Sequence, residues 1–118
     1  MQRFTQKHRL KKAGEFSSVF LFRGVVHGEY LKIHYKPNQL LDSRLGLVVG
    51  KRVHKKANRR NYMKRSLREL FRCNQSLIDG IDIIIRVVKY FDYTNRADIN
   101  QEFIFLLNKL NHKLHRHA

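Results

Sequence analysis

The sequence predicts a small α/β sandwich that forms a single domain over residues 1–118. Three observations predict this fold class. Apolar residues recur at helical spacing in three segments, they alternate or run continuously in the segments between, and no repeat or Pro/Gly-rich linker divides the chain. The length fits one domain with a modest core. The predicted order is helix, two or three strands, helix, strand, helix.

The first half of the chain is predicted to form one short helix followed by strands. The helix ends at Gly24. Its apolar face carries Phe16, Val19 and Phe20. Residues 25–36 are predicted to be extended, because apolar and polar side chains alternate near their end. A turn that includes Pro37 then leads to a buried strand over 44–50.

The second half is predicted to form a helix, a strand and a helix. Asn58 is a plausible N-cap for a helix over about 59–73. The continuous apolar run at 81–88 is typical of a strand covered on both sides. The last helix is expected to start near Thr94 or Asn95, and the basic tail after it is expected to fray. The strand–helix–strand unit between 44 and 88 predicts a parallel pair of strands.

The charge of the chain predicts a polyanionic partner. There are 25 Lys and Arg against 9 Asp and Glu, a formal net charge of +16. Such an imbalance destabilises the folded state by self-repulsion unless a polyanion neutralises it. Nucleic acid is the first candidate and an anionic membrane surface the second. No apolar run approaches the roughly 18 residues of a spanning helix. No apolar region follows the basic N-terminus, so no signal peptide is expected. One cysteine allows no internal disulfide, which fits a reducing cytoplasm.

The densest charge lies between Lys51 and Arg72, which contain ten Lys or Arg and one acid, Glu69. On a helical wheel, apolar residues gather on one face, and the opposite face carries Asn61, Lys64, Arg65, Arg68 and Arg72. A merely solvated helix usually mixes acids with bases, so this one-sided ridge favours contact with nucleic acid. No helix-turn-helix or zinc-finger spacing accompanies the helix, which makes sequence-specific reading of DNA the less favoured interpretation.

Two further pairs of residues allow two interpretations each. Phe16 and Phe20 are either ordinary core residues or platforms on which unpaired bases stack. Lys32 and His34 lie on the polar face of their strand. They form either a solvated surface or the floor of a basic groove.

The sequence does not support an autonomous enzyme. A two-metal nuclease needs several converging carboxylates, and the acids of this chain are scattered. No nucleophile–base set is suggested, and the histidines and Cys73 lack the spacing of metal ligands. We therefore predict no catalytic residue and no metal site in the protein.

Two blocks of sequence, 44–52 and 56–72, resemble the protein subunit of bacterial ribonuclease P. The family has a Leu-Gly-Leu strand, a Lys-Lys or Lys-Arg step and a helix that carries an Arg-Asn-Arg motif and ends in Arg-Glu-x-Phe-Arg. The corresponding residues here are 45–47, 51–52, 60–62 and 68–72. The N-terminal region is also similar to the opening of the family. One departure is that Tyr62 stands where the motif has its second arginine. We expect position 62 to lie beside the basic ridge.

The resemblance implies a fold and a division of labour. The implied fold is an α+β two-layer sandwich with the element order αβββαβα and a left-handed βαβ crossover. Folds of this kind are called ribosomal-protein-S5-domain-2-like. The usual preference would predict the opposite hand. In this family a catalytic RNA with bound Mg²⁺ cleaves precursor tRNA, and the protein holds the single-stranded 5′ leader between its first helix and its sheet. The implied partners are ribonuclease P RNA and precursor tRNA, in the cytoplasm, with no membrane and no small-molecule substrate.

These observations together predict a non-catalytic subunit of a ribonucleoprotein endonuclease. The predicted leader cleft consists of Phe16, Phe20, Lys32 and His34. The predicted RNA-binding residues are Lys51, Arg52, Lys56, Arg59, Arg60, Asn61, Lys64, Arg65, Arg68 and Arg72. The rival hypotheses are a structural ribosomal or RNA-chaperone protein with no role in cleavage, and a protein-only nuclease.

Overall fold

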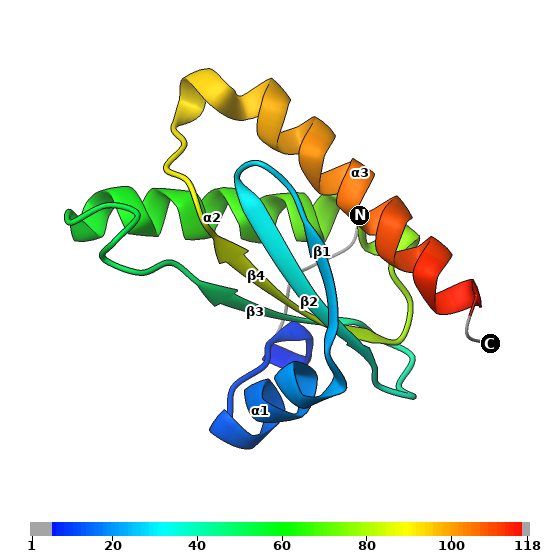
Figure 1. The fold of residues 1–118 in the computed structure, drawn as a ribbon. Helices are drawn as coiled ribbons and strands as arrows, with labels where there is room; N and C mark the ends of the chain where they lie inside the picture. The colour runs from blue at the N-terminus through cyan, green and yellow to red at the C-terminus, as the bar shows by residue number, and fades with distance from the viewer. Residues whose placement is uncertain (1–5, 117–118) are drawn as a thin grey trace.

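A computed structural model describes residues 6–116 as three α-helices and a four-stranded sheet (Figure 1). In chain order the elements are α1 (Ala13–Phe22), β1 (Gly24–His27), β2 (Leu31–Pro37), β3 (Arg44–Val48), α2 (Ala57–Cys73), β4 (Ile81–Val87) and α3 (Arg96–Arg116). The predicted order of helices and strands is confirmed, with three strands between the first two helices. Within the described residues no helix combines the length and apolar character needed to cross a membrane.

The sheet has the strand order β1-β2-β4-β3. Strand β2 is antiparallel to both β1 and β4, whereas β3 and β4 are parallel and are joined through α2. The predicted parallel pair is therefore confirmed, and the sheet is mixed. The left-handed crossover stays a prediction from the family resemblance.

The two faces of the sheet are covered by different helices (Figure 1). The large core lies between the sheet and helices α2 and α3, and its fully buried side chains include Ile33, Ile85, Leu67 and Phe103. Helix α1 covers part of the other face, where Val19 packs with Ile84 in a much smaller cluster. The sheet is thus deeply covered on one side and incompletely covered on the other.

Helix α3 also holds the turn between β1 and β2. The carboxylate of Glu102 accepts hydrogen bonds from the backbone amides of Glu29, Tyr30 and Leu31, at 2.7–3.2 Å. The preceding residue, Gly28, leaves no space for a side chain, because a Cβ there would lie 2.5 Å from the carboxyl carbon of Glu102. The hairpin is therefore fixed to a helix far away in the sequence.

Two predicted boundaries in the first half of the chain are wrong. Helix α1 ends at Phe22, before the expected Gly24, because Arg23 takes the left-handed conformation (φ 65°) that closes it and Gly24 already belongs to β1. Pro37 is the last residue of β2 and pairs with Ile81, so the turn begins after it.

The boundaries of α2 and α3 also differ from the prediction. Helix α2 begins at Ala57, with Lys56 in an extended conformation before it, so Asn58 lies inside the first turn and is not the N-cap. Helix α3 follows a single 3₁₀ turn at Tyr93–Asn95 and continues to Arg116. The basic tail that was expected to fray is therefore helical as far as the described residues extend.

Candidate RNA interface

The opposite faces of α2 have the character that the sequence predicts. Met63, Leu67 and Phe71 are fully buried against the sheet. The other face, here called the α2 ridge, consists of Asn61, Lys64, Arg65, Arg68 and Arg72. Its residues are exposed or half-buried, so a long stretch of basic surface follows the helix.

The residues of the ridge differ in what they already contact. Arg72 pairs with Glu69 one turn away on the same helix, and its Nε donates to the carboxylate at 3.1 Å. Arg68 is half-buried, and burial, followed by the neighbouring charges of Arg9 and Arg65, lowers its pKa. Arg65 is exposed and has no hydrogen bond or ion pair within residues 6–116. Arg65 is therefore the arginine of the ridge that is most available to an external phosphate.

Arg60 has an internal role that the sequence did not indicate. Its Nη1 donates to the carbonyl oxygens of His54 and Lys55, at 2.9 and 2.7 Å. The half-buried side chain therefore fixes the loop that leads into α2.

The loop before α2 and its first turn present further basic residues. Lys51, Arg52 and Lys56 are exposed, as is Arg59 in the first turn of the helix. The side chains of Lys51, Arg52 and Lys56 make no hydrogen bond or ion pair within the described part of the chain. This surface is continuous along the chain with the α2 ridge.

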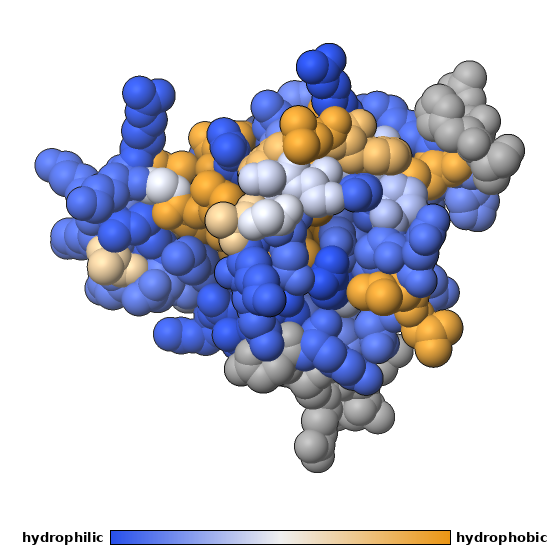
Figure 2. Space-filling view, turned by 90° about the horizontal axis from the view of Figure 1, so that it is seen from below, coloured by the Kyte–Doolittle hydropathy of each residue, from blue (hydrophilic) through white to orange (hydrophobic). Residues whose placement is uncertain are grey.

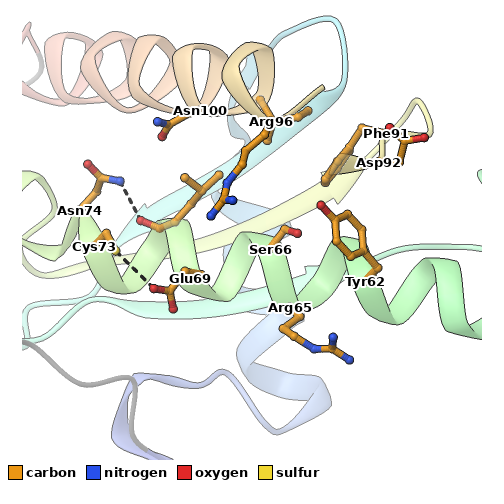
Figure 3. A pocket seen from close by; sticks show the side chains of 12 residues that line it. Tyr62, Arg65, Ser66, Glu69, Cys73, Asn74, Phe91, Asp92, Arg96 and Asn100 are labelled. Carbon is orange, nitrogen blue, oxygen red and sulfur yellow. Dashed lines mark hydrogen bonds between the residues drawn. The ribbon is translucent and has the colours of Figure 1, made fainter. Parts of the chain in front are cut away.

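Tyr62 borders the ridge beside Arg65 and also packs into the protein. It is half-buried, packs against the large core and lines a groove of about 640 Å³ between α2 and α3. Figure 3 shows Tyr62 pointing from α2 toward Phe91 and Asp92, while Arg65 points away from α3. The residue that replaces the family arginine therefore faces the interior side of α2.

The side chain of Phe16 extends from α1 toward the sheet and packs over Gly46 of β3. A Cβ on Gly46 of β3 would approach the Phe16 ring to 2.7 Å, so the absence of a side chain makes room for the ring. A groove of about 180 Å³ opens beside Phe16, and Lys64 and Arg68 of α2 line it together with Arg9. Sequence reasoning missed Arg9, which is brought here by a parallel bridge between Arg9 and Leu45.

Phe20 and His34 form the aromatic part of the predicted cleft. Their ring centroids are 4.8 Å apart in an edge-to-face arrangement, and both residues are half-buried. Burial, followed by the nearby charges of Lys32, Arg86 and His27, lowers the pKa of His34. The Nε2 atom of His34 is buried and has no hydrogen-bond partner among the described residues. His34 is therefore a neutral ring at neutral pH and does not supply positive charge to the cleft.

The structure brings the four predicted cleft residues to one side of the sheet. Lys32 lies two residues from His34 on the same face of β2, half-buried and without a hydrogen bond or ion pair among residues 6–116. On the α1 side of the molecule, a hydrophobic band lies within strongly hydrophilic surface (Figure 2). Phe16 and Phe20 are packed against the small cluster and each remains partly accessible to solvent.

The acids near the cleft are engaged within the protein. Arg44 donates to both carboxylate oxygens of Asp82, at 2.8 and 2.7 Å, and its Nη1 donates to Glu15 at 2.8 Å. Within the described residues no three His, Cys, Asp or Glu side chains gather in a way that could hold a metal ion.

Comparison with known proteins identifies relatives over most of the chain. The profile of the family described as Ribonuclease P matches residues 4–111. The ribonuclease P protein component of Azoarcus sp. is 43% identical over 109 residues, which cover 92% of this chain and 91% of that protein. The corresponding protein of Chromobacterium violaceum is 47% identical over 96 residues, 81% of this chain and 79% of that protein.

Solved structures of such proteins share the fold. The RNase P protein of Staphylococcus aureus superposes with a TM-score of 0.75 at 26% identity, covering 86% of this chain and 93% of that chain. The RNase P protein of Thermotoga maritima gives a TM-score of 0.72 at 28% identity, covering 86% of this chain and 96% of that chain.

Proposed function

Because the chain belongs to the ribonuclease P protein family and is the protein subunit of that tRNA-processing endoribonuclease, we propose that its basic surfaces divide the binding of RNA. The α2 ridge and the loop before it bind the RNA subunit. The cleft between α1 and the sheet binds the single-stranded 5′ leader of precursor tRNA. The RNA subunit performs the cleavage.

The α2 surface suits a structured RNA. Its charges are one-sided, and several of its basic side chains, including Lys51, Arg52 and Arg65, have no partner within residues 6–116. Arginine side chains match phosphate oxygens in a bidentate manner, and lysines add point charge. Binding of this kind reads the RNA backbone and releases counterions, so it weakens as salt rises.

The observation that carries the leader assignment is the Phe20–His34 pair beside Lys32. Two rings at 4.8 Å form an edge on which an unpaired base can stack, and base stacking on aromatic side chains is worth roughly 1–3 kcal/mol per base. Lys32 on the same strand face supplies an uncompensated charge for the adjoining phosphate.

We also propose that the Mg²⁺ used in cleavage is held by the RNA subunit and the substrate. Two carboxylates on the α1 side of the sheet, Glu15 and Asp82, are already paired with Arg44. The proposed compartment is the cytoplasm, in which the single cysteine, Cys73, stays reduced.

The experiment that tests the function is reconstitution with a bacterial ribonuclease P RNA. We expect the protein to lower the Mg²⁺ concentration needed for cleavage of precursor tRNA, since it adds positive charge where RNA phosphates converge. An unchanged Mg²⁺ requirement would contradict the proposal. Cleavage by the purified protein without RNA would contradict the assignment of catalysis to the RNA subunit.

The leader assignment is tested separately with Phe20→Ala in the holoenzyme. The variant should weaken binding of precursor tRNA that carries a leader of several nucleotides, by about 1–3 kcal/mol for a stacked base. Binding of mature tRNA should barely change. Because Phe20 is only half-buried, the free energy of unfolding should fall by less than the roughly 3–5 kcal/mol of a fully buried Phe. Equal losses for both substrates would make Phe20 a purely structural residue.

A further inference from the structure

The sheet face that carries α1 has three rows of side chains that run across the strands. The strand register places Lys36, Asp82 and Arg44 in the first row. The second row contains Val25, His34, Ile84 and Gly46. The third row contains His27, Lys32, Arg86 and Val48. Each row crosses neighbouring strands that lie about 4.8 Å apart.

The first two rows are already engaged inside the protein. In the first row Arg44 pairs with Asp82 and Glu15, and the ammonium of Lys36 donates to Ser18 of α1. In the second row Ile84 is fully buried against α1. Most side chains of these two rows thus contact helix α1 or pair with its residues.

The third row is basic except at Val48, which packs against the small cluster beneath α1. His27 and Arg86 are exposed and Lys32 is half-buried, and none of the three makes a hydrogen bond or ion pair among residues 6–116. Lys32 and Arg86 are direct cross-strand partners. Like charges in that position destabilise a sheet. An unneutralised row of this kind is suited to a polyanionic ligand that removes the repulsion when it binds.

We infer that Arg86, with Lys32 and His27, binds consecutive phosphates of the unpaired RNA strand that enters the cleft. This inference rests on the proposed leader function and extends it to a residue of β4. The three side chains span two strand spacings, about 10 Å. The bases then face Phe20 and the neutral ring of His34, and the phosphates follow the third row across β1, β2 and β4. Because phosphates carry no sequence information, Arg86 strengthens the binding of leaders of any sequence.

The test compares Arg86→Gln with a matched control, Arg96→Gln, in the reconstituted holoenzyme. Arg96 is exposed at the start of α3 and loses the same charge when replaced. Affinity is measured across a salt series for precursor tRNA with a leader of several nucleotides and for mature tRNA. Arg86→Gln should weaken precursor binding about tenfold, the value of one charge-assisted hydrogen bond. It should also flatten the slope of log affinity against log salt by about 0.7.

The leader contribution is the gain in affinity of precursor tRNA over mature tRNA. Arg86→Gln should leave the binding of mature tRNA unchanged, and Arg96→Gln should leave the leader contribution unchanged. The isolated Arg86→Gln protein should be at least as stable as the parent, because the substitution removes a like-charge pair with Lys32. A result in which Phe20→Ala loses the leader contribution but Arg86→Gln keeps it overturns the inference and leaves the leader cleft in place. A leader contribution retained in both variants overturns the leader cleft itself.

Discussion

Replacement of Arg44 by methionine should be one of the most destabilising single changes on the α1 side of the sheet. The side chain of Asp82 is only 6% exposed, and Arg44 donates to both of its oxygens. After Arg44→Met, the side-chain donor that this buried carboxylate keeps among residues 6–116 is the amide of Asn38, at 2.8 Å. Removal of one partner of a buried ion pair costs about 3–5 kcal/mol. For a chain of this length we expect Tm to fall by about 10–25 °C.

The assay is thermal and urea unfolding of the isolated protein, followed by circular dichroism. The informative comparison is the double variant Arg44→Met/Asp82→Leu, which removes both charges and leaves the net charge unchanged. It should recover most of the lost stability, because an apolar pair of similar volume avoids the desolvation of an unpaired carboxylate. A loss below about 1 kcal/mol in the single variant, or no recovery in the double variant, would refute the assignment of this pair as a buried ionic contact.

Three further predictions follow from contacts described above. Arg65→Ala should weaken binding to the RNA subunit and flatten its salt slope by about 0.7–0.9, whereas Arg72→Ala should do so less because Arg72 is already paired on its own helix; equal salt slopes for the two variants would contradict this. Gly28→Ala should destabilise the fold, because its methyl group would collide with the carboxylate of Glu102, and an unchanged urea midpoint would show that the turn can move away. Hydrogen bonds from the two backbone amides before α1, and then the charge of Arg44, lower the pKa of Glu15 from its ordinary value of 4.5. The stabilisation of the fold by ionised Glu15 is therefore complete above about pH 4.5 and is lost as the pH falls through the folded pKa. Glu15→Gln should accordingly reduce the acid dependence of Tm.

The spacing of apolar residues predicts which face of a single helix or strand is buried. Met63, Leu67 and Phe71 recur at helical spacing, and all three are buried. The apolar run of β4 likewise predicts a strand covered on both faces, and its one exposed residue, Arg86, interrupts that run. The alternation of Asp82, Ile84 and Arg86 could have indicated the third row, because residues two apart on a strand share a face.

Contacts that depend on the backbone path of loops or of distant segments are the part that the sequence does not predict. The bonds of Arg60 depend on the backbone path of His54 and Lys55, and a charge pattern contains no information about that path. The same holds for Arg9, which reaches the groove beside Phe16 only because its segment pairs with Leu45. A basic residue that holds a loop and one that faces RNA look identical in a sequence.

The attachment of the β1–β2 turn to Glu102 has a consequence for the order of events during synthesis. The turn amides and the carboxylate are 71–73 residues apart in the chain. At a translation rate of about 5–20 residues per second, several seconds pass between the emergence of the hairpin and that of the residue that fixes it. Strand β4, the partner of both β2 and β3, also appears late. The hairpin that carries Lys32 and His34 is therefore fixed only after Glu102 has left the ribosome, so a nascent chain has these two residues before it has the proposed leader cleft.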